Sequence, residues 1–143
     1  SEVRDLVAEL KLSDIVRFSE FLPATRLPES LGLAELAIVT LRAGFEGLIV
    51  PSKILGYMAR GIAVMYVGPV SDVDSYISRS GCGVALRNGD VAGVARAIVD
   101  LHADPNTLAA LGDAGKRYYD AALARDHGLA RYEAVVRSCL AGN

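Results

Sequence analysis

A glycine-rich loop that leads into a helix is the part of this sequence best suited to chemistry. The loop, GFEGL, covers residues 44–48, and the helix opens with Pro51, Ser52 and Lys53. Glycines let a backbone approach a ligand closely, and the unpaired N–H groups of a first helical turn carry a partial positive charge. Ser52 adds a hydroxyl, and Lys53 adds a full charge that opposes the helix dipole unless an anion lies nearby. These residue types favour a phosphate site, the alternative being a flexible loop with a solvated lysine.

A second loop and the carboxylate of the first loop are weaker candidates. Glu46 is the only carboxylate in residues 44–48, where it either accepts hydrogen bonds from sugar hydroxyls or is solvated. Residues 68–71 also lead from an apolar run into a capped helix, and an ordinary turn with Ser71 as the N-cap explains them at least as well. Neither loop matches the dinucleotide fingerprint G-x-G-x-x-G or the phosphate loop G-x-x-x-x-G-K-[ST].

The histidines and cysteines give little support to metal or acid–base chemistry. His102 lies in a predicted helix near Asp104, and His127 lies in a polar turn beside Asp126. Cys82 lies between glycines before a short apolar run, where a small buried residue is the expected role. The motifs H-E-x-x-H and C-x-x-C are absent from the sequence. We therefore expect no metal and no cofactor, and the catalytic residues stay unassigned.

Composition limits the class of protein. The 143 residues are 52% hydrophobic and 22% charged, with a formal net charge of −2, so we expect one folded domain over residues 1–143. Acidic and basic residues are scattered, which argues against nucleic acid or an anionic membrane as the partner. Two cysteines make no disulfide framework, and the longest apolar run, residues 61–70, is about half of a membrane span. A cytoplasmic domain is the expectation.

Short apolar runs alternate with amphipathic stretches along the chain. Strands are predicted over residues 15–18, 37–41, 62–67 and 83–86. Helices are predicted from Val3 to Leu10, from Pro28, from Pro51 to Gly61, after Ser71, Asp90 and Asp104, and over about residues 129–140. Strands separated by helices run parallel, which predicts a doubly wound α/β sheet with helices on both faces.

Doubly wound sheets bind their ligands at the carboxyl ends of the strands. The site is therefore expected in the loops that follow Phe18, Leu41, Val67 and Leu86. The glycine-rich loop is the one that follows Leu41, so the residue chemistry and the topology predict the same place.

Together these segments resemble the C-terminal, donor-binding domain of a two-domain GT-B glycosyltransferase of family 4. The resemblance covers about residues 6–136 and is carried by three segments in order. They are VRFSEFLPATRLPESLGLAELAIVTLR, GFEGLIVPSKILGYMARGIAVMYVG and SGCGVALRNGDVAGVARAIVDLHADPNTLAALGDAGKRYYDAAL. The Val-Pro-Ser-Lys helix followed by Tyr-Met-Ala-x-Gly is similar to the branch that builds bacterial polysaccharides from nucleotide sugars.

The resemblance implies a Rossmann-like fold with C-terminal helices, one half of a GT-B enzyme, and a UDP- or GDP-sugar as ligand. The full-length enzyme would be a retaining transferase that moves a hexose-type sugar to a glycan or lipid-linked acceptor without a cofactor. By the same resemblance, the nucleotide base would be held by Glu20, Phe21 and Leu22. The diphosphate and donor sugar would be held by Gly44, Phe45, Glu46, Gly47, Leu48, Ser52, Lys53 and Gly68.

The sequence departs from the family pattern at two points. The family commonly has two glutamates across this loop and helix, and their places fall on Leu48 and Gly56, so the carboxylate that usually binds the ribose is missing. An Arg and a Lys that usually clamp the diphosphate would precede residue 1, as would the acceptor-binding domain. We therefore expect the chain to be part of a longer enzyme, with that N-terminal domain as its partner, and to catalyse no transfer alone. The longer enzyme would be cytoplasmic, peripheral at the inner membrane face where its acceptor is lipid-linked, with no direct membrane contact from this domain.

Two other functions stay open. A nucleotide-sugar 2-epimerase shares the architecture and the ligand, but it uses carboxylates and histidines near the strand ends, where this sequence offers only Glu20 and Glu46. A degenerate domain that binds no nucleotide and serves as an interaction surface is favoured by the glycine at position 56.

Overall fold

The structure is a computed structural model that describes residues 2–19, 23, 25–26, 29, 31–48 and 52–141. The chain divides into two compact units, Ser1–Ser30 and Leu31–Asn143. All strands found in the described residues belong to the second unit. In the described part of the chain, no helix has the length and apolar character needed to cross a membrane. The expectation of one domain over the whole chain stays a prediction.

The first unit begins with the helix that the apolar spacing predicts. α1 spans Glu2–Glu9 and buries Val7. It ends where Lys11 adopts a left-handed backbone, with φ of 56°. The Leu12 N–H then donates to the Val7 carbonyl at 2.9 Å and the Lys11 N–H to the Ala8 carbonyl at 3.1 Å, which are the paired bonds of a Schellman motif.

The strand predicted over residues 15–18 is wrong. Ile15 donates its N–H to the Leu12 carbonyl at 3.0 Å and so closes a turn. The Arg4 guanidinium lies over the Phe18 ring, 4.5 Å from the ring centroid. A strand requires hydrogen bonds to a neighbouring strand, and here local bonds satisfy the turn's backbone instead.

The helix predicted from Pro28 is described only in part. Glu29 and Leu31 are helical, and Pro28 itself lies outside the described residues. The chain turns at Gly32, and the Ala34 N–H donates to the Leu31 carbonyl at 3.1 Å before the first strand begins.

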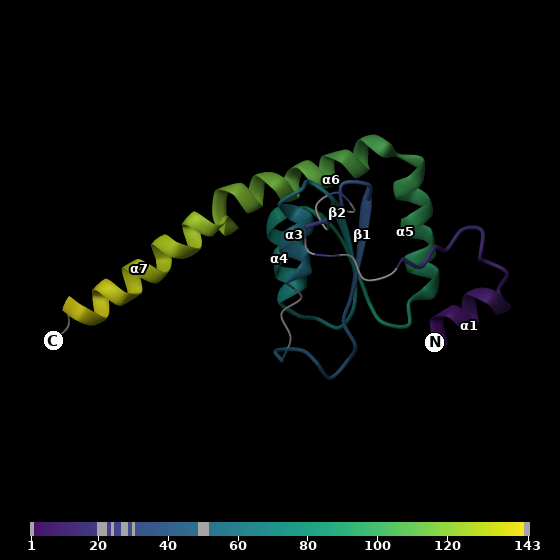
Figure 1. Cartoon of the computed structure of the whole chain (residues 1–143), viewed down its shortest axis with the longest axis horizontal. Coiled ribbons are helices and arrows are strands. Elements are labelled where there is room, and N and C mark those ends of the chain that lie inside the picture. Colours follow the sequence, from purple (N-terminus) through teal and green to yellow (C-terminus); the bar gives the residue numbers. More distant parts are fainter. Residues whose placement is uncertain are drawn as a thin grey trace. The chain divides into compact units, whose positions relative to one another are not determined.

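The second unit is built on a sheet of three parallel strands in the order β1-β2-β3 (Figure 1). The strands are β1 Leu36–Thr40, β2 Ala63–Val67 and β3 Gly83–Leu86. Each lies within one residue of its predicted bounds. In the register, Leu36 pairs with Ala63 and Val64 with Gly83. β2 is central and buried except at its last residue, as a continuous apolar run predicts for a strand covered on both faces.

Helices connect and extend these strands. They are α3 Lys53–Met58, α4 Asp72–Ser80, α5 Val91–Ala103, α6 Pro105–Tyr118 and α7 Arg125–Ala141, with a π-helical turn η1 Tyr119–Leu123 before α7. The predicted N-caps Ser71, Asp90 and Asp104 each accept hydrogen bonds from first-turn N–H groups. Hydrogen bonds from the Thr107 hydroxyl and N–H hold the pKa of the Asp104 carboxyl below its ordinary value.

Two glycines end helices as predicted. At the end of α3, Gly61 has φ of 69° and the Ile62 N–H donates to the Tyr57 carbonyl at 3.1 Å. At the end of α4, Gly81 has φ of 66° and donates to the Ile77 carbonyl at 2.8 Å. Because glycine carries no Cβ, both positions adopt the left-handed backbone without strain and turn the chain toward the next strand.

The helices cover the two faces of the sheet unequally. α3 and α4 lie on one side of the strands and α5 on the other (Figure 1). The α3/α4 side holds a core that includes Ile54, Met58, Val64, Tyr66, Val73 and Cys82. On the α5 side only Leu101 of the helix is buried, and Val91 keeps 78% of its surface exposed. In β1, by contrast with β2, Ile38 in the middle of the strand is 52% exposed, so one face of β1 is open there.

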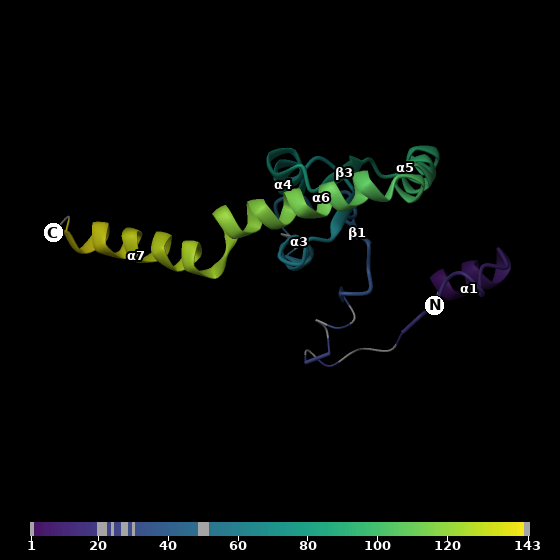
Figure 2. The same cartoon turned by 90° about the horizontal axis from the view of Figure 1, so that it is seen from above.

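α6 runs across the sheet (Figure 2) and packs closely against the amino ends of β2 and β3. Its two buried glycines make this approach possible. A Cβ on Gly112 would overlap the Gly61 carbonyl oxygen, and a Cβ on Gly115 would lie 2.8 Å from the Cys82 Cβ. α6 therefore covers the sheet at the edge opposite to the one where parallel sheets bind ligands.

Candidate ligand site at the carboxyl edge of the sheet

Three loops meet at the carboxyl edge of the sheet. They are the β1–α3 loop (residues 41–52), the β2–α4 loop (residues 68–71) and the β3–α5 turn (residues 87–90). The strand ends hold them side by side, because the Leu41 N–H donates to the Val67 carbonyl at 3.2 Å and the Gly68 N–H to the Leu86 carbonyl at 3.0 Å. The structure thus brings together the loops that the sequence predicted after Leu41, Val67 and Leu86.

The glycine-rich part of the β1–α3 loop is exposed throughout its described residues. Gly44 and Gly47 have φ of 89° and 74°, values that residues with a Cβ rarely adopt. Nothing lies within 4 Å of the place where a Cβ would be at either glycine. The Gly44 N–H donates to Glu46 Oε2 at 2.8 Å, so one oxygen of this carboxylate is used within the loop. The loop is thus open enough for a ligand to approach its backbone at these glycines.

The helix after this loop is shorter than the sequence suggested. α3 begins at Lys53 and has six residues, and Pro51 lies outside the described residues. Ser52 takes the N-cap position with a helical backbone, and its hydroxyl makes no capping hydrogen bond. A helix dipole weakens with so few peptide units, so the electrostatic attraction for an anion here depends mainly on the Lys53 charge.

The β2–α4 loop is held by a buried phenol. The Tyr66 side chain is fully buried, and its hydroxyl donates to the Pro69 carbonyl at 2.8 Å and lies 2.9 Å from Ser71 Oγ. A Cβ on Gly68 would collide with this phenol. Ser71 and Asp74 form a capping box, in which the Ser71 N–H donates to Asp74 Oδ2 at 2.9 Å. The N-cap interpretation of this loop is confirmed, and contact of Gly68 with a ligand stays a prediction.

The β3–α5 turn carries two polar residues that the sequence analysis did not single out. Asn88 Nδ2 donates to the Leu41 carbonyl at 3.0 Å. Arg87 pairs with Asp74 Oδ1 at 2.8 Å and donates to the Gly68 carbonyl at 3.4 Å. In the sequence, the Asn-Gly dipeptide after an apolar run indicates a turn at this place, but it does not indicate which residues the turn's side chains bond to.

Two cations at this edge have no ion-pair partner among the described residues. Arg42 follows β1 and Lys53 begins α3, and both side chains are exposed. Arg87, by contrast, is neutralised by Asp74. Sequence reasoning named Lys53 and missed Arg42, whose signal was its place directly after a strand. Positive charge without a protein counter-ion suits an anionic ligand.

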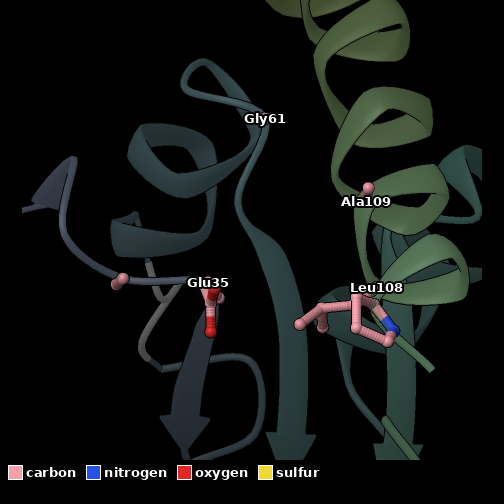
Figure 3. A pocket seen from close by; sticks show the side chains of 6 residues that line it. Glu35, Gly61, Leu108 and Ala109 are labelled. Carbon is pink, nitrogen blue, oxygen red and sulfur yellow. The ribbon is translucent and has the colours of Figure 1, made fainter. Parts of the chain in front are cut away.

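Hollows in the described surface lie at both edges of the sheet. At the carboxyl edge, a hollow of about 310 Å³ is lined by Val67, Gly89, Asp90, Val91, Val94, Ala95 and Ile98. None of the predicted donor-binding residues lines it, although Gly68 follows Val67 directly. At the amino edge, a hollow of about 180 Å³ lies between the start of β1 and α6, with Glu35 and Leu108 on its walls (Figure 3).

Some predictions fall outside what the structure describes. Glu20, Phe21 and Leu22, assigned to the nucleotide base, lie outside the described residues. No group of three or more metal-ligating side chains gathers anywhere in the part of the chain that is described.

The two cysteines differ in exposure, which gives a direct test of the core. Cys82 is fully buried and Cys139 is exposed. Burial raises the pKa of the Cys82 thiol, so little reactive thiolate forms there near neutral pH. In a disulfide-exchange assay of the folded chain, we expect Cys139 to react rapidly and Cys82 to react only in denaturant. Equal rates for both thiols in the folded chain would contradict the packing of α6 over Cys82.

The comparisons with known proteins support the fold. No protein-family model matches the sequence, and no curated protein matches it. Among solved structures, the chain is similar to sucrose-phosphate synthase from Thermosynechococcus elongatus, with a TM-score of 0.83 and 20% identity over 99% of this chain. The chain spans about a third (34%) of the length of that protein. The expected fold class, a Rossmann-like α/β fold with a parallel sheet and C-terminal helices, is confirmed.

Proposed function

We propose that this chain binds the nucleotide-sugar donor of a retaining glycosyltransferase, as the donor-binding half of a GT-B enzyme of the family 4, Pro-Ser-Lys type. The ligand is a UDP- or GDP-sugar. The full-length enzyme transfers a hexose-type sugar to a glycan or lipid-linked acceptor in bacterial polysaccharide synthesis. In this proposal the N-terminal domain supplies the other wall of the active site, so the chain alone catalyses no transfer.

The observation that carries the proposal is the charge at the carboxyl edge. Arg42 and Lys53 flank the open glycine loop and make no ion pair with any described residue. A nucleoside diphosphate brings negative charges to this edge and accepts charge-assisted hydrogen bonds. The similarity to part of a sucrose-phosphate synthase, whose name describes the synthesis of a sugar phosphate, is consistent with a ligand that carries both sugar and phosphate groups.

The chemistry assigned to this half is stabilisation of the leaving group. Sugar transfer releases a nucleoside diphosphate, whose charge grows as the glycosidic bond breaks. Lys53 and the Ser52 hydroxyl contact the diphosphate and stabilise that charge, and the exposed backbone at Gly44 and Gly47 lets the phosphates approach. The second carboxylate oxygen of Glu46 accepts a hydrogen bond from the donor sugar.

An NMR titration of the ¹⁵N-labelled chain with UDP, GDP and the corresponding monophosphates tests the proposal. We expect shifts confined to residues 19–22, 44–53 and 68–71, and the base that gives the tighter complex identifies the nucleotide. Absence of shifts in both this chain and the full-length protein would favour a degenerate domain. Isotope exchange at the sugar C2 by the full-length protein would favour an epimerase. Sugar transfer by this chain alone would contradict its role as an inactive half.

Replacing Lys53 gives the sharpest test of a single contact. We expect Lys53→Ala to weaken UDP or GDP binding about tenfold, because a hydrogen bond to a charged group contributes about 1.5 kcal/mol. Lys116→Ala is the matched control, since Lys116 lies on α6, exposed and paired with Asp120. Unchanged affinity in Lys53→Ala, measured by the same titration, would remove Lys53 from the site.

A further inference from the structure

Two adjacent residues after β3 fasten the ends of all three strands. Asn88 Nδ2 donates to the Leu41 carbonyl at 3.0 Å, at the end of β1. Arg87 donates to the Gly68 carbonyl at 3.4 Å, at the end of β2, and pairs with Asp74 at 2.8 Å. We call Arg87 and Asn88, with these bonds, the 87–88 bridge.

The hydrogen bonds of the 87–88 bridge lie where the regular backbone hydrogen bonds between the strands end. The Leu41 N–H makes the last bond of β1 to β2, and the Gly68 N–H makes the last bond of β2 to β3. Beyond these bonds, no strand among the described residues donates to the Leu41 or Gly68 carbonyl, and the 87–88 bridge supplies a donor to each. Unpaired ends of strands separate readily, so side-chain bonds here hold the two loops at a fixed spacing.

The turn geometry makes these contacts possible. The Asp90 N–H donates to the Arg87 carbonyl at 3.1 Å, which closes a tight turn over residues 87–90. Gly89 has φ of 87°, the conformation that the third residue of a type II turn requires. The turn reverses the chain immediately after Asn88, so two consecutive side chains reach two different strands.

We propose that Arg87 and Asn88 are positioning residues of the donor site. They set the spacing between the β1–α3 loop, which leads into Lys53 at the start of α3, and the β2–α4 loop, without touching the ligand. This inference rests on the proposed function for its ligand, a nucleoside diphosphate, and on the hydrogen bonds alone for its structural part. The two parts are tested separately.

Binding measurements test the link to the site. In the NMR titration with UDP or GDP, we expect Asn88→Ala to weaken binding about fivefold, with Asn106→Ala on α6 as the control without effect. Because Asn88 acts on binding by positioning the loop that leads into Lys53, the double variant with Lys53→Ala should bind about tenfold weaker than the native chain. Independent effects would give about fiftyfold, and that result would overturn the positioning role.

Amide hydrogen exchange tests the bridge whether or not nucleotide binds. We expect Asn88→Ala to speed exchange at the Leu41 amide while the Val64 amide, which donates to the Cys82 carbonyl at the other end of β2, exchanges at its native rate. Arg87→Lys keeps a charge for Asp74 but loses the second contact, so it should speed exchange at Gly68 and not at Leu41. Equal acceleration at all three amides would show general destabilisation and overturn the inference. If the native chain binds no nucleotide while the exchange pattern holds, the proposed function fails and the bridge stands.

Discussion

Gly112→Ala is expected to lower the free energy of unfolding by about 3 kcal/mol. Gly112 is buried where α6 meets the start of β2, and the added Cβ would overlap the Gly61 carbonyl oxygen. That oxygen belongs to backbone at a turn with φ of 69°, so it has little freedom to move. α6 must therefore shift away from the sheet and lose contacts along its length, and urea denaturation followed by circular dichroism measures the loss.

The control for this prediction is the same change at a helical glycine whose Cβ position is open. Gly128 lies in α7, and nothing is found within 4 Å of a Cβ built there. Gly128→Ala should leave the unfolding free energy unchanged or raise it by up to about 1 kcal/mol, because alanine is the better helix former. If Gly112→Ala also proves neutral, then α6 does not pack on Gly61 as described.

Tyr66→Ala is expected to cost about 3–5 kcal/mol of stability, since it empties the largest fully buried side chain of the core. Tyr66→Phe separates the two roles of this residue. It keeps the ring but leaves the Pro69 carbonyl and Ser71 Oγ without their phenol partner, for an expected loss of about 1–2 kcal/mol. Both losses are measured by denaturant unfolding.

Tyr132 supplies the matched control, because it is 76% exposed on α7 and makes no hydrogen bond through its side chain among the described residues. Tyr132→Phe should leave stability unchanged. A loss in Tyr66→Phe no larger than in this control would show that the phenol hydroxyl does not hold the β2–α4 loop. The Tyr66 ring would then serve the core alone.

These contacts divide the carboxyl edge into a rigid part and an open part. The β2–α4 loop is fastened by Tyr66, Ser71 and Asp74, whereas residues 42–48 of the β1–α3 loop are exposed and bonded mainly to themselves. A ligand that binds between the two loops would contact a preorganised β2–α4 loop on one side and an exposed, less constrained β1–α3 loop on the other. We expect the affinity of the proposed site to depend on how closely the 87–88 bridge holds the β1–α3 loop to the β2–α4 loop.

Local sequence patterns determined most elements of the second unit. The run of apolar residues in β2, the capping side chains Ser71, Asp90 and Asp104, and the terminating glycine Gly61 each act within a few residues of their own position. Interactions of this range are readable along a chain, because the partner is fixed by spacing. The predicted place of the site after β1 followed from the parallel order of the strands.

The tertiary structure decided what depends on partners distant in sequence. Residues 15–18 alternate like a strand but form no ladder, because pairing is a property of two segments and not of one. Ile38 and Val91 are likewise exposed, which shows that an apolar pattern does not reveal whether another element of the fold packs over these residues. The bond from Asn88 to Leu41 joins residues 47 positions apart, and only the folded sheet brings them within hydrogen-bond distance. The sequence alone thus identified the types of residue at the candidate site. The distances between the loops that carry them are set by contacts across the strand ends, which only the folded structure shows.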